Sequence, residues 1–317
     1  MSGWQQIDVN VQFRIISHYI VYFFRKVTAT ILQNVTKYVT LCDMDAVIRE
    51  KSINGSIKTA DLVSWLLSNG ITTVTSEEIS VLLGIPENHI RQRLAPLAKR
   101  NEIISPYRGF WIPIPYEYRQ WGAPEAIYYI DQMMRFLCVD YYVGWMSAAA
   151  ILGAGHHASQ VFQVATAKLV RNRAIGRSDF RFYQRSNVGF LPSFRHQTQT
   201  GAANVSTRAA TMLSAANDLN IVSGLNNAAN TIIELSETEE YFIGDVAACS
   251  ALFPISALRR IGWILENFTD TLGLDQLADI SQESKVKQSK LSTYKPYSDR
   301  INKKWSLDIN ERIEPDV

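Results

Sequence analysis

Residues 59–115 carry the clearest periodic pattern of apolar and polar positions in the chain. An apolar-periodic helix is expected at about residues 60–67, closed by Asn69 and Gly70, which tolerate the left-handed backbone found at helix ends. The β-branched residues 71–74 then predict a short extended segment. This stretch therefore begins as a helix followed by a strand.

Two further helices and a hairpin are expected after this strand. The segment Thr75–Glu78 offers hydroxyls that cap a helix and acids for its first turn, and Gly84 is expected to end that helix. A third helix is predicted at about residues 86–99. Residues 102–105 and 110–113 read as two strands joined by a four-residue turn. Three helices and a hairpin predict a winged helix-turn-helix.

The third helix has an apolar stripe and a polar face. At about 100° per residue, Ile90, Leu94 and Leu97 fall within about 60° of arc and are expected to face the core. The candidate DNA-contacting residues on the opposite face and its flanks are Asn88, His89, Arg91, Gln92, Lys99 and Arg100. Amides that bond base edges and cations that bond phosphates suit a helix in the major groove.

Two residues near this helix modify the prediction. Arg108, at the hairpin tip, is expected to reach the next phosphate or the minor groove. Pro96 removes a backbone donor and is expected to bend the helix or separate its last turn. The alternative to DNA binding is a winged helix that serves only packing or protein contacts.

Composition favours an ordinary globular protein of two or three domains. The chain has 317 residues, 47% of them hydrophobic and 20% charged. Its net charge is only +2, so a nucleic-acid contact must come from local basic patches. Cys42, Cys138 and Cys249 form no CxxC pair, which fits a reducing cytosol and argues against a zinc site.

Residues 1–43 leave three interpretations open. Their apolar run, residues 15–24, is bracketed by basic residues and is about half the length that spans a bilayer. The segment is a packed amphipathic helix, a membrane-surface helix or upstream sequence outside the native protein. We hypothesise that translation starts at Met44; an intact mass that includes residues 1–43 would exclude this start.

The rest of the chain predicts two further parts. Between residues 116 and 200 we expect helices at 124–138 and 145–152 and extended segments at 141–143, 160–167 and 180–183. Beyond it we expect helices at 206–216, 224–235, 245–249, 256–268 and 272–278, a polar linker at 283–290 and a strand at 305–309. The predicted fold class is therefore multi-domain α+β. Its parts are an N-terminal extension (1–43), a winged helix-turn-helix (44–115), a small α+β middle domain (116–200) and a mainly helical C-terminal part with a terminal strand (201–317).

A basic run in the middle domain is a possible second binding surface. It comprises Lys168, Arg171, Arg173, Arg177, Arg181, Arg185 and Arg195, opposed within its span only by Asp179. The run either contacts DNA backbone, RNA or a toxin through the bidentate guanidinium, or forms an ordinary solvated surface. If it binds phosphates, replacing Arg171, Arg173 and Arg177 with glutamine flattens the salt dependence of DNA binding.

No motif in the chain predicts catalysis, a metal site or a cofactor. His156 and His157 are adjacent but lack further ligands nearby, and a loop or helix-end pair is the simpler reading. Residues 176–179 (GRSD) faintly resemble the start of a nucleotidyltransferase site. That chemistry needs downstream carboxylates, and none occurs between Phe180 and Asn217. No nucleophile elbow is present to anchor a serine triad.

Several weak motifs occur in the order that is typical of one family. They are LLSNGITTVTSEEISVLLGIPENHIRQRLAPLAKRNEI with YRGFWIP, then YYVGWMSAAAILGA, VFQVATAK, VSTRAATMLSAA and WSLDINERIEPD. Over residues 60–317 the chain resembles the AbiEi family of antitoxins, transcriptional regulators of type IV toxin–antitoxin and phage abortive-infection systems. It departs from that family at residues 1–43, at Pro96 and at Pro86, where a serine or threonine cap is common.

The resemblance implies a cytoplasmic, non-enzymatic regulator without cofactor or membrane attachment. Its winged helix is expected to bind inverted repeats in double-stranded promoter DNA and to repress its own operon, which needs two copies of the protein. Its C-terminal part is expected to antagonise a nucleotidyltransferase-like toxin without a stable complex. One alternative is an interaction antitoxin whose DNA binding is secondary or lost. The other is an enzyme acting on the toxin or on RNA, for which the sequence supplies no active site.

Overall fold

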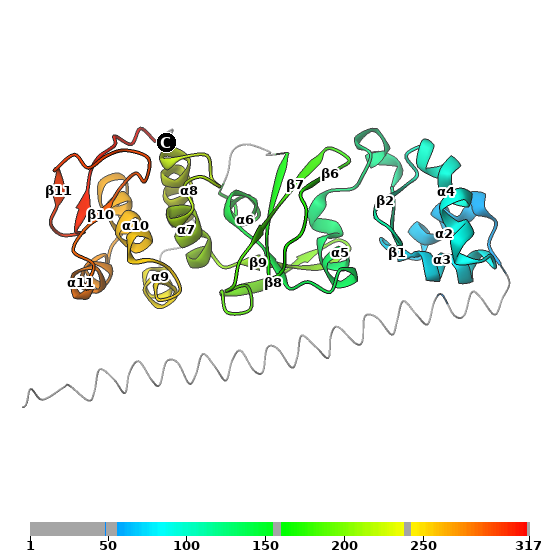
Figure 1. Ribbon diagram of the computed structural model, residues 1–317, viewed down its shortest axis with the longest axis horizontal. Coiled ribbons are helices and arrows are strands. Elements are labelled where there is room, and N and C mark those ends of the chain that lie inside the picture. The colour runs from blue at the N-terminus through cyan, green and yellow to red at the C-terminus, as the bar shows by residue number, and fades with distance from the viewer. Residues whose placement is uncertain (1–47, 49–55, 155–159, 238–241, 316–317) are drawn as a thin grey trace, which may run out of the picture. The chain divides into compact units, whose positions relative to one another are not determined.

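The computed structural model describes residues 48, 56–154, 160–237 and 242–315, which form a mixed α+β fold with three sheets (Figure 1). The predictions for residues 1–44 and for the pair His156–His157 lie outside the described residues. The chain divides into two compact units. The first contains residues 1–62 and 75–94, and the second contains residues 63–74 and 95–317.

The first helices begin and end where local signals placed them. A 3₁₀ turn, η1 (Thr59–Asp61), precedes α2 (Leu62–Ser68), and Gly70 follows with φ +69°. Helix α3 (Ser76–Leu83) ends at Gly84, whose φ is +64°. Thr75 caps α3: its Oγ1 accepts the Glu78 N–H at 3.2 Å, and the Glu78 carboxylate accepts the Thr75 N–H at 2.6 Å. The predicted cap is therefore a complete capping box.

Replacing Thr75 with alanine is expected to lower the free energy of unfolding by about 1 kcal/mol, because the first turn of α3 loses its cap. Urea unfolding followed by circular dichroism measures the change. Ser64→Ala, at an exposed position inside α2, is the control and should change stability by less than about 0.5 kcal/mol. Equal effects of the two substitutions would show that the capping box contributes nothing.

The third helix is later and more continuous than expected. Pro86 is extended (φ −59°, ψ 143°), and residues Glu87–His89 form a 3₁₀ turn, η2, before α4 (Ile90–Lys99) begins. Pro96 does not separate the last turn, because α4 runs through it to Lys99. The missing Pro96 N–H therefore does not end the helix.

The predicted hairpin is present but shares a core with later elements. Strands β2 (Ile103–Tyr107) and β3 (Phe110–Pro113) pair antiparallel, and β1 (Val74–Thr75) completes a sheet of order β1-β3-β2. Phe110 and Ile112 belong to one buried cluster with Tyr129 and Met133. The predicted domain boundary after residue 115 thus separates side chains that pack together.

A six-stranded sheet forms the centre of the second unit (Figure 1). Its strands are β4 (Tyr141–Val143), β5 (Val161–Thr166), β6 (Arg173–Ile175), β7 (Ser178–Gln184), β8 (Ser193–Thr198) and β9 (Gly201–Ser206), in the order β6-β7-β5-β4-β9-β8. The predicted extended segments 160–167 and 180–183 are confirmed by strands β5 and β7, which pair in parallel. Because β8 and β9 form an antiparallel hairpin, the boundary predicted after residue 200 falls inside that hairpin.

Alternating side chains of this sheet face two different cores. Tyr141 and Val143 join a cluster with α5 (Ile130–Phe136), whereas Tyr142 between them joins a cluster with α6 (Trp145–Ile151) and α7 (Arg208–Asn217). This is the period of two that a strand buried on both faces requires. The turns η3 (Tyr116–Trp121) and η4 (Ala126–Tyr128) precede α5.

Helices dominate the C-terminal part, as the sequence predicts. Thr207 caps α7, and the later elements are α8 (Leu225–Glu237), α9 (Ile243–Ser250), α10 (Ile255–Phe268), α11 (Asp275–Glu283), β10 (Ser289–Lys290), β11 (Ile301–Asn302) and β12 (Leu307–Asp308). Helix α11 begins later than predicted because Gly273 is left-handed, at φ +79°. Strand β12 begins only at Leu307 because Ser306, at φ +47°, turns the chain.

Two buried arginines on α10 hold this part together. Arg259 donates to Ser289 Oγ at 3.0 Å and to the carbonyl oxygen of Val286 at 2.7 Å. Arg260 donates to the carbonyl oxygens of Leu291 at 2.7 Å and Ala216 at 2.9 Å. Burial lowers the pKa of Arg260 to about 10, which still leaves it charged at neutral pH. Both guanidinium groups therefore serve as multi-donor ties between α10 and the terminal strands.

Candidate functional site

A helix, a three-residue turn and a second helix follow one another over residues 76–99. Residues 84–86 connect α3 to η2 and α4, and the left-handed Gly84 makes the tight exit from α3 possible. Ser80 Oγ donates to the carbonyl oxygen of Ile85 at 2.6 Å, which fixes the turn. Such a connection is typical of a helix-turn-helix.

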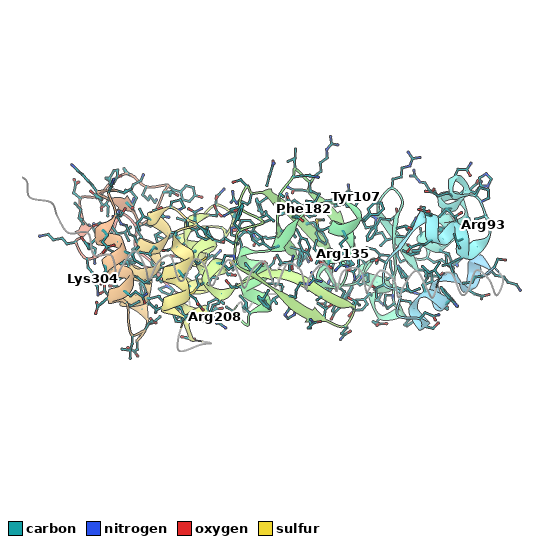
Figure 2. The ribbon with its side chains drawn as sticks, turned by 90° about the horizontal axis from the view of Figure 1, so that it is seen from below. Arg93, Tyr107, Arg135, Phe182, Arg208 and Lys304 are labelled. Atoms are coloured by element: carbon teal, nitrogen blue, oxygen red, sulfur yellow. The ribbon has the colours of Figure 1, made fainter. Side chains whose placement is uncertain are left out.

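Helix α4 presents the predicted polar face to solvent. Ile90 and Leu94 are 0% exposed and Leu97 is 2% exposed, which confirms the predicted core stripe. The candidate DNA-contacting residues Asn88, His89, Arg91, Gln92 and Lys99 are all exposed. Arg93 (labelled in Figure 2) is exposed as well. Arg93 is not among the predicted DNA-contacting residues, because helical geometry places it beside the core stripe. A long side chain at such a position still reaches water.

The cations near α4 differ in their partners. No carboxylate among the described residues forms an ion pair with Arg91, Arg93 or Lys99. Arg100 instead donates to both Glu102 oxygens, at 3.0 and 3.1 Å, and this hydrogen bonding lowers the pKa of Glu102. Because Glu102 partly neutralises it, Arg100 is expected to attract a phosphate less strongly than Arg91, Arg93 and Lys99 do.

Arg108 occupies the two-residue turn of the β2–β3 hairpin with Gly109, whose φ is +86°. Its side chain is exposed, and no ion pair involves it in the described part of the chain. The turn is shorter than the four residues expected, because β2 continues through a bulge to Tyr107. Arg108 is thus an exposed cation at a hairpin tip, without an ion-pair partner among the described residues.

The basic run of residues 168–195 does not form one free surface. Three of its arginines form ion pairs: Arg181 with Asp179 at 2.6 Å, Arg185 with Asp218 at 2.8 Å and Arg195 with Asp131 at 2.7 Å. Two of these carboxylates lie outside the run, so counting charges within its span could not reveal them. The run is therefore partly neutralised by carboxylates from distant parts of the chain.

The other cations of the run lie mostly on aromatic rings or a carbonyl. The Arg173 guanidinium is 3.8 Å from the Tyr107 ring centroid and that of Arg177 is 3.4 Å from the Trp121 centroid. Lys168 donates to the carbonyl oxygen of Cys138 at 3.3 Å. Arg171 is exposed, and no described carboxylate pairs with it. Arg171 is the best-placed residue of the run for a phosphate.

Asp131 is the centre of a buried charged cluster. It accepts hydrogen bonds from Arg195 to both oxygens, at 2.7 and 3.1 Å, and pairs with Arg135 (labelled in Figure 2) at 2.6 Å. Tyr141 donates its hydroxyl to Asp131 at 2.9 Å. Burial and the Asp131 charge raise the pKa of Tyr141 well above its ordinary value, so it stays a donor. The cluster ties α5 to strands β4 and β8.

A second cluster surrounds Trp145, the first residue of α6. Trp145 has φ +50°, an uncommon backbone for a bulky residue. Its indole N–H donates to Asp218 at 2.9 Å, and Asp218 also holds Arg185. The ring packs edge-on against Tyr183 at 5.0 Å. The strained residue therefore joins α6, β7 and the end of α7.

The described residues hold no group of three or more histidine, cysteine, aspartate or glutamate side chains that could bind a metal ion. Within the same residues, no helix is both long and apolar enough to cross a membrane. The clusters around Asp131 and Trp145 are built from ion pairs and hydrogen bonds between structural elements. The exposed face of α4 is thus the strongest candidate site.

Comparisons with known proteins match part of the second unit to a family. No curated protein matches the chain. The chain is similar to the crystal structure of the RV2827C protein from Mycobacterium tuberculosis, with a TM-score of 0.54 and 13% identity over 78% of this chain and 89% of that chain. At that identity the likeness shows the fold alone. Residues 142–267 match the family model of the AbiEi antitoxin C-terminal domain. These residues, which include Trp145 and its partners Tyr183 and Asp218, therefore carry an AbiEi antitoxin C-terminal domain, which supports an antitoxin role.

Proposed function

We propose that this antitoxin is also a transcriptional regulator, whose helix α4 binds inverted repeats in its own promoter and represses its operon. The observation that carries the proposal is the exposed face of α4, where Arg91, Arg93 and Lys99 lack ion-pair partners among the described residues. Side chains that protein carboxylates do not neutralise are available to phosphates. The helix-turn-helix connection from α3 supports the same function.

The residue types on η2 and α4 suggest a division of roles. Gln92 and Asn88 carry amides, which can bond the edge of adenine in the major groove with two hydrogen bonds. Arg91, Arg93 and Lys99 suit the phosphates on either side. His89 and Arg108 are further candidates for the backbone. Inverted repeats require two copies of the protein, as a dimer or as separate monomers on adjacent half-sites.

The antitoxin function is proposed to reside in the second unit. Residues 142–267 carry the family match, and they combine part of the six-stranded sheet with helices α6 to α10. We propose that this part antagonises a nucleotidyltransferase-like toxin in the cytoplasm, as in a type IV system, without a stable complex and without catalysis by the antitoxin. A toxin gene beside this one would support that part of the proposal.

The full chain with Arg91→Ala and Gln92→Ala is expected to bind its upstream promoter DNA roughly 10–100-fold more weakly than wild type, because one phosphate contact and one base contact are lost. Gel shifts with competitor DNA measure the difference. The control is Arg181→Ala with Gln276→Ala, which removes the same side-chain types from exposed positions of the second unit, and Arg181 is already paired with Asp179. Truncation after residue 115 is a poorer test, because it exposes Phe110 and Ile112.

If folded wild-type protein binds the promoter no better than competitor DNA, the regulator part of the proposal fails. The interaction antitoxin then remains, because it requires only the family domain. If the α4 variant and the control lose affinity equally, the DNA contact lies elsewhere in the chain.

A further inference from the structure

Residues 284–304, here called the basic segment, concentrate positive charge at the end of the second unit. The segment contains six lysines and Arg300 against a single carboxylate, Asp299, for a net charge of +6, whereas the whole chain carries only +2. It includes strands β10 and β11 and the loop between them. A charge excess of this size within one small module is an electrostatic footprint for a polyanion.

Most of these cations form no ion pair with the residues that the structure describes. Lys304 is neutralised by Glu266 at 2.8 Å and Asp275 at 3.3 Å. Lys290 donates to the carbonyl oxygen of Lys295 at 3.0 Å. The remaining cations, Lys285, Lys287, Lys295, Arg300 and Lys303, are exposed and form no ion pair with a described carboxylate. By contrast, the arginines of residues 173–195 form ion pairs or lie on aromatic rings.

Two tyrosines stand out from the same segment. Tyr294 is 61% exposed and Tyr297 is 58% exposed, and both belong to residues 292–298, here called the tyrosine loop. Lys290 lies 5.3 Å from the centroid of the Tyr297 ring. Aromatic rings interleaved with free cations are typical of surfaces that bind single-stranded nucleic acid, because bases stack on the rings while cations meet the phosphates.

The tyrosine loop is held in place by two side chains of the last strand region. Asn310 donates to the carbonyl oxygens of Ser292, Lys295 and Pro296 at 2.9, 3.1 and 3.0 Å, and its own oxygen accepts the Ser292 N–H at 2.9 Å. Asp308, which is 0% exposed, accepts the Ser298 N–H and hydroxyl, both at 2.8 Å. These bonds fix the loop backbone while the two rings stay in solvent.

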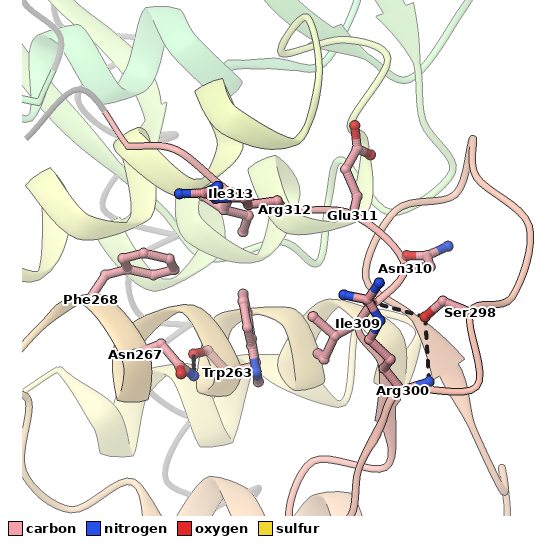
Figure 3. Close-up of a pocket in the computed structure, with 10 residues that line it drawn as sticks. All are labelled: Trp263, Asn267, Phe268, Ser298, Arg300, Ile309, Asn310, Glu311, Arg312 and Ile313. Carbon is pink, nitrogen blue, oxygen red and sulfur yellow. Dashed lines mark hydrogen bonds between the residues drawn. The ribbon is translucent and has the colours of Figure 1, made fainter.

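A pocket beside the tyrosine loop adds another aromatic surface (Figure 3). Its volume is about 520 Å³, within the usual range for small-ligand pockets. Its lining includes Ser298, from the tyrosine loop, and Asn310, which holds that loop in place. Trp263 and Phe268 of α10 supply apolar lining, and Arg300, the residue before β11, supplies a cation. The pocket is large enough for one nucleobase.

We propose that the basic segment and the tyrosine loop bind single-stranded nucleic acid. Tyr294 and Tyr297 stack on successive bases, Lys285, Lys287 and Lys295 contact phosphates, and the pocket beside Trp263 receives one base. A duplex is a poorer match, because its bases are already stacked on one another and are not available to exposed rings. This site shares no residue with α4 and goes beyond the proposed promoter binding.

The full chain is expected to bind fluorescent oligo(U) or oligo(dT) of about 15 nucleotides, and Tyr294→Ala with Tyr297→Ala should weaken binding at least about tenfold. Fluorescence anisotropy measures the affinity, and the RNA and DNA arms show whether the sugar matters. Tyr116→Ala is the matched control, since that tyrosine is 82% exposed outside the segment, and its affinity should equal wild type. Circular dichroism should be unchanged in both variants, because the removed rings make little buried contact.

Two further measurements separate this site from α4. Replacing Lys285, Lys287 and Lys295 with glutamine should reduce the slope of log affinity against log salt by about 2. Arg91→Ala with Gln92→Ala should weaken promoter binding more than oligonucleotide binding, and Tyr294→Ala with Tyr297→Ala should do the reverse. No binding by wild type, oligonucleotide binding that Tyr294→Ala with Tyr297→Ala retains, or oligonucleotide binding that falls more with the α4 variant than with this tyrosine variant would each overturn the proposal. A preference for duplex over single strand would also overturn it.

Discussion

Asp131→Ala is expected to lower the free energy of unfolding by about 3 kcal/mol, because removing one partner of a buried ion pair leaves the other charge buried without its partner. The carboxylate accepts hydrogen bonds from Arg195 and Tyr141 and pairs with Arg135. Its removal leaves the Arg195 guanidinium, on strand β8, without a carboxylate partner. The lower end of the usual range applies because the Arg195 side chain is 27% exposed. Urea or thermal unfolding of the full chain measures the loss.

Asp179→Ala is the matched control for this cluster. Asp179 also pairs with an arginine, Arg181, at 2.6 Å, but its side chain is 35% exposed and that of Arg181 is 46% exposed. An exposed pair contributes about 1 kcal/mol or less. A loss at Asp131 no greater than the loss at Asp179 would show that water screens the buried cluster as well.

Gly262→Ala is expected to destabilise the C-terminal part by about 3 kcal/mol or more, because a methyl group there would overlap the Trp305 ring. Trp305 is 0% exposed and donates its indole N–H to Glu266 at 2.6 Å, so the ring cannot move away freely. Helix α10, which also carries Arg259 and Arg260, would separate from the strands that it holds. Thermal unfolding monitored by tryptophan fluorescence measures this effect.

Gly244→Ala provides the control, because Gly244 lies in helix α9 with nothing within 4 Å of an added methyl group. Alanine there should raise stability by up to about 1 kcal/mol, as alanine favours a helix over glycine. Opposite signs at the two glycines are the expected result. A neutral Gly262→Ala would mean that Trp305 packs differently against α10.

Local signals explain why many helix boundaries could be predicted. Thr75 and Thr207 cap helices through their own hydroxyls, and Gly84 ends a helix because glycine adopts a left-handed backbone without a steric penalty. The apolar stripe of α4 is likewise set by residues within one helix. Such features depend on neighbours a few residues away, which the sequence displays directly.

Long-range features could not be predicted in the same way. Strands β8 and β9 contain few large apolar residues, and their place beside β4 depends on pairing that no local pattern specifies. The partner of Arg195 is Asp131, 64 residues earlier. Within its own span the basic run has only one carboxylate, but in the fold carboxylates from distant residues neutralise part of its charge. Arg91, Arg93 and Lys99 of α4 form no ion pair with the described residues, so these cations remain available to bind phosphates.

The position of α4 on DNA can be measured directly with a cleavage reagent attached at residue 92. An iron chelate on Gln92→Cys requires that no other thiol reacts, so Cys42 and the exposed Cys138 are first replaced with serine. Cys249 can remain, because burial raises the pKa of its thiol to about 12 and keeps it protonated at neutral pH. Gln276→Cys, on α11, carries the reagent in the control.

With the chelate at residue 92, strand cleavage is expected to centre within each half of an inverted repeat in the promoter, and no such pattern is expected with the chelate at residue 276. Specific binding without cleavage from residue 92 would contradict the placement of α4 in the groove. Absence of specific binding by the labelled, folded protein and by wild type would contradict the DNA-binding function itself.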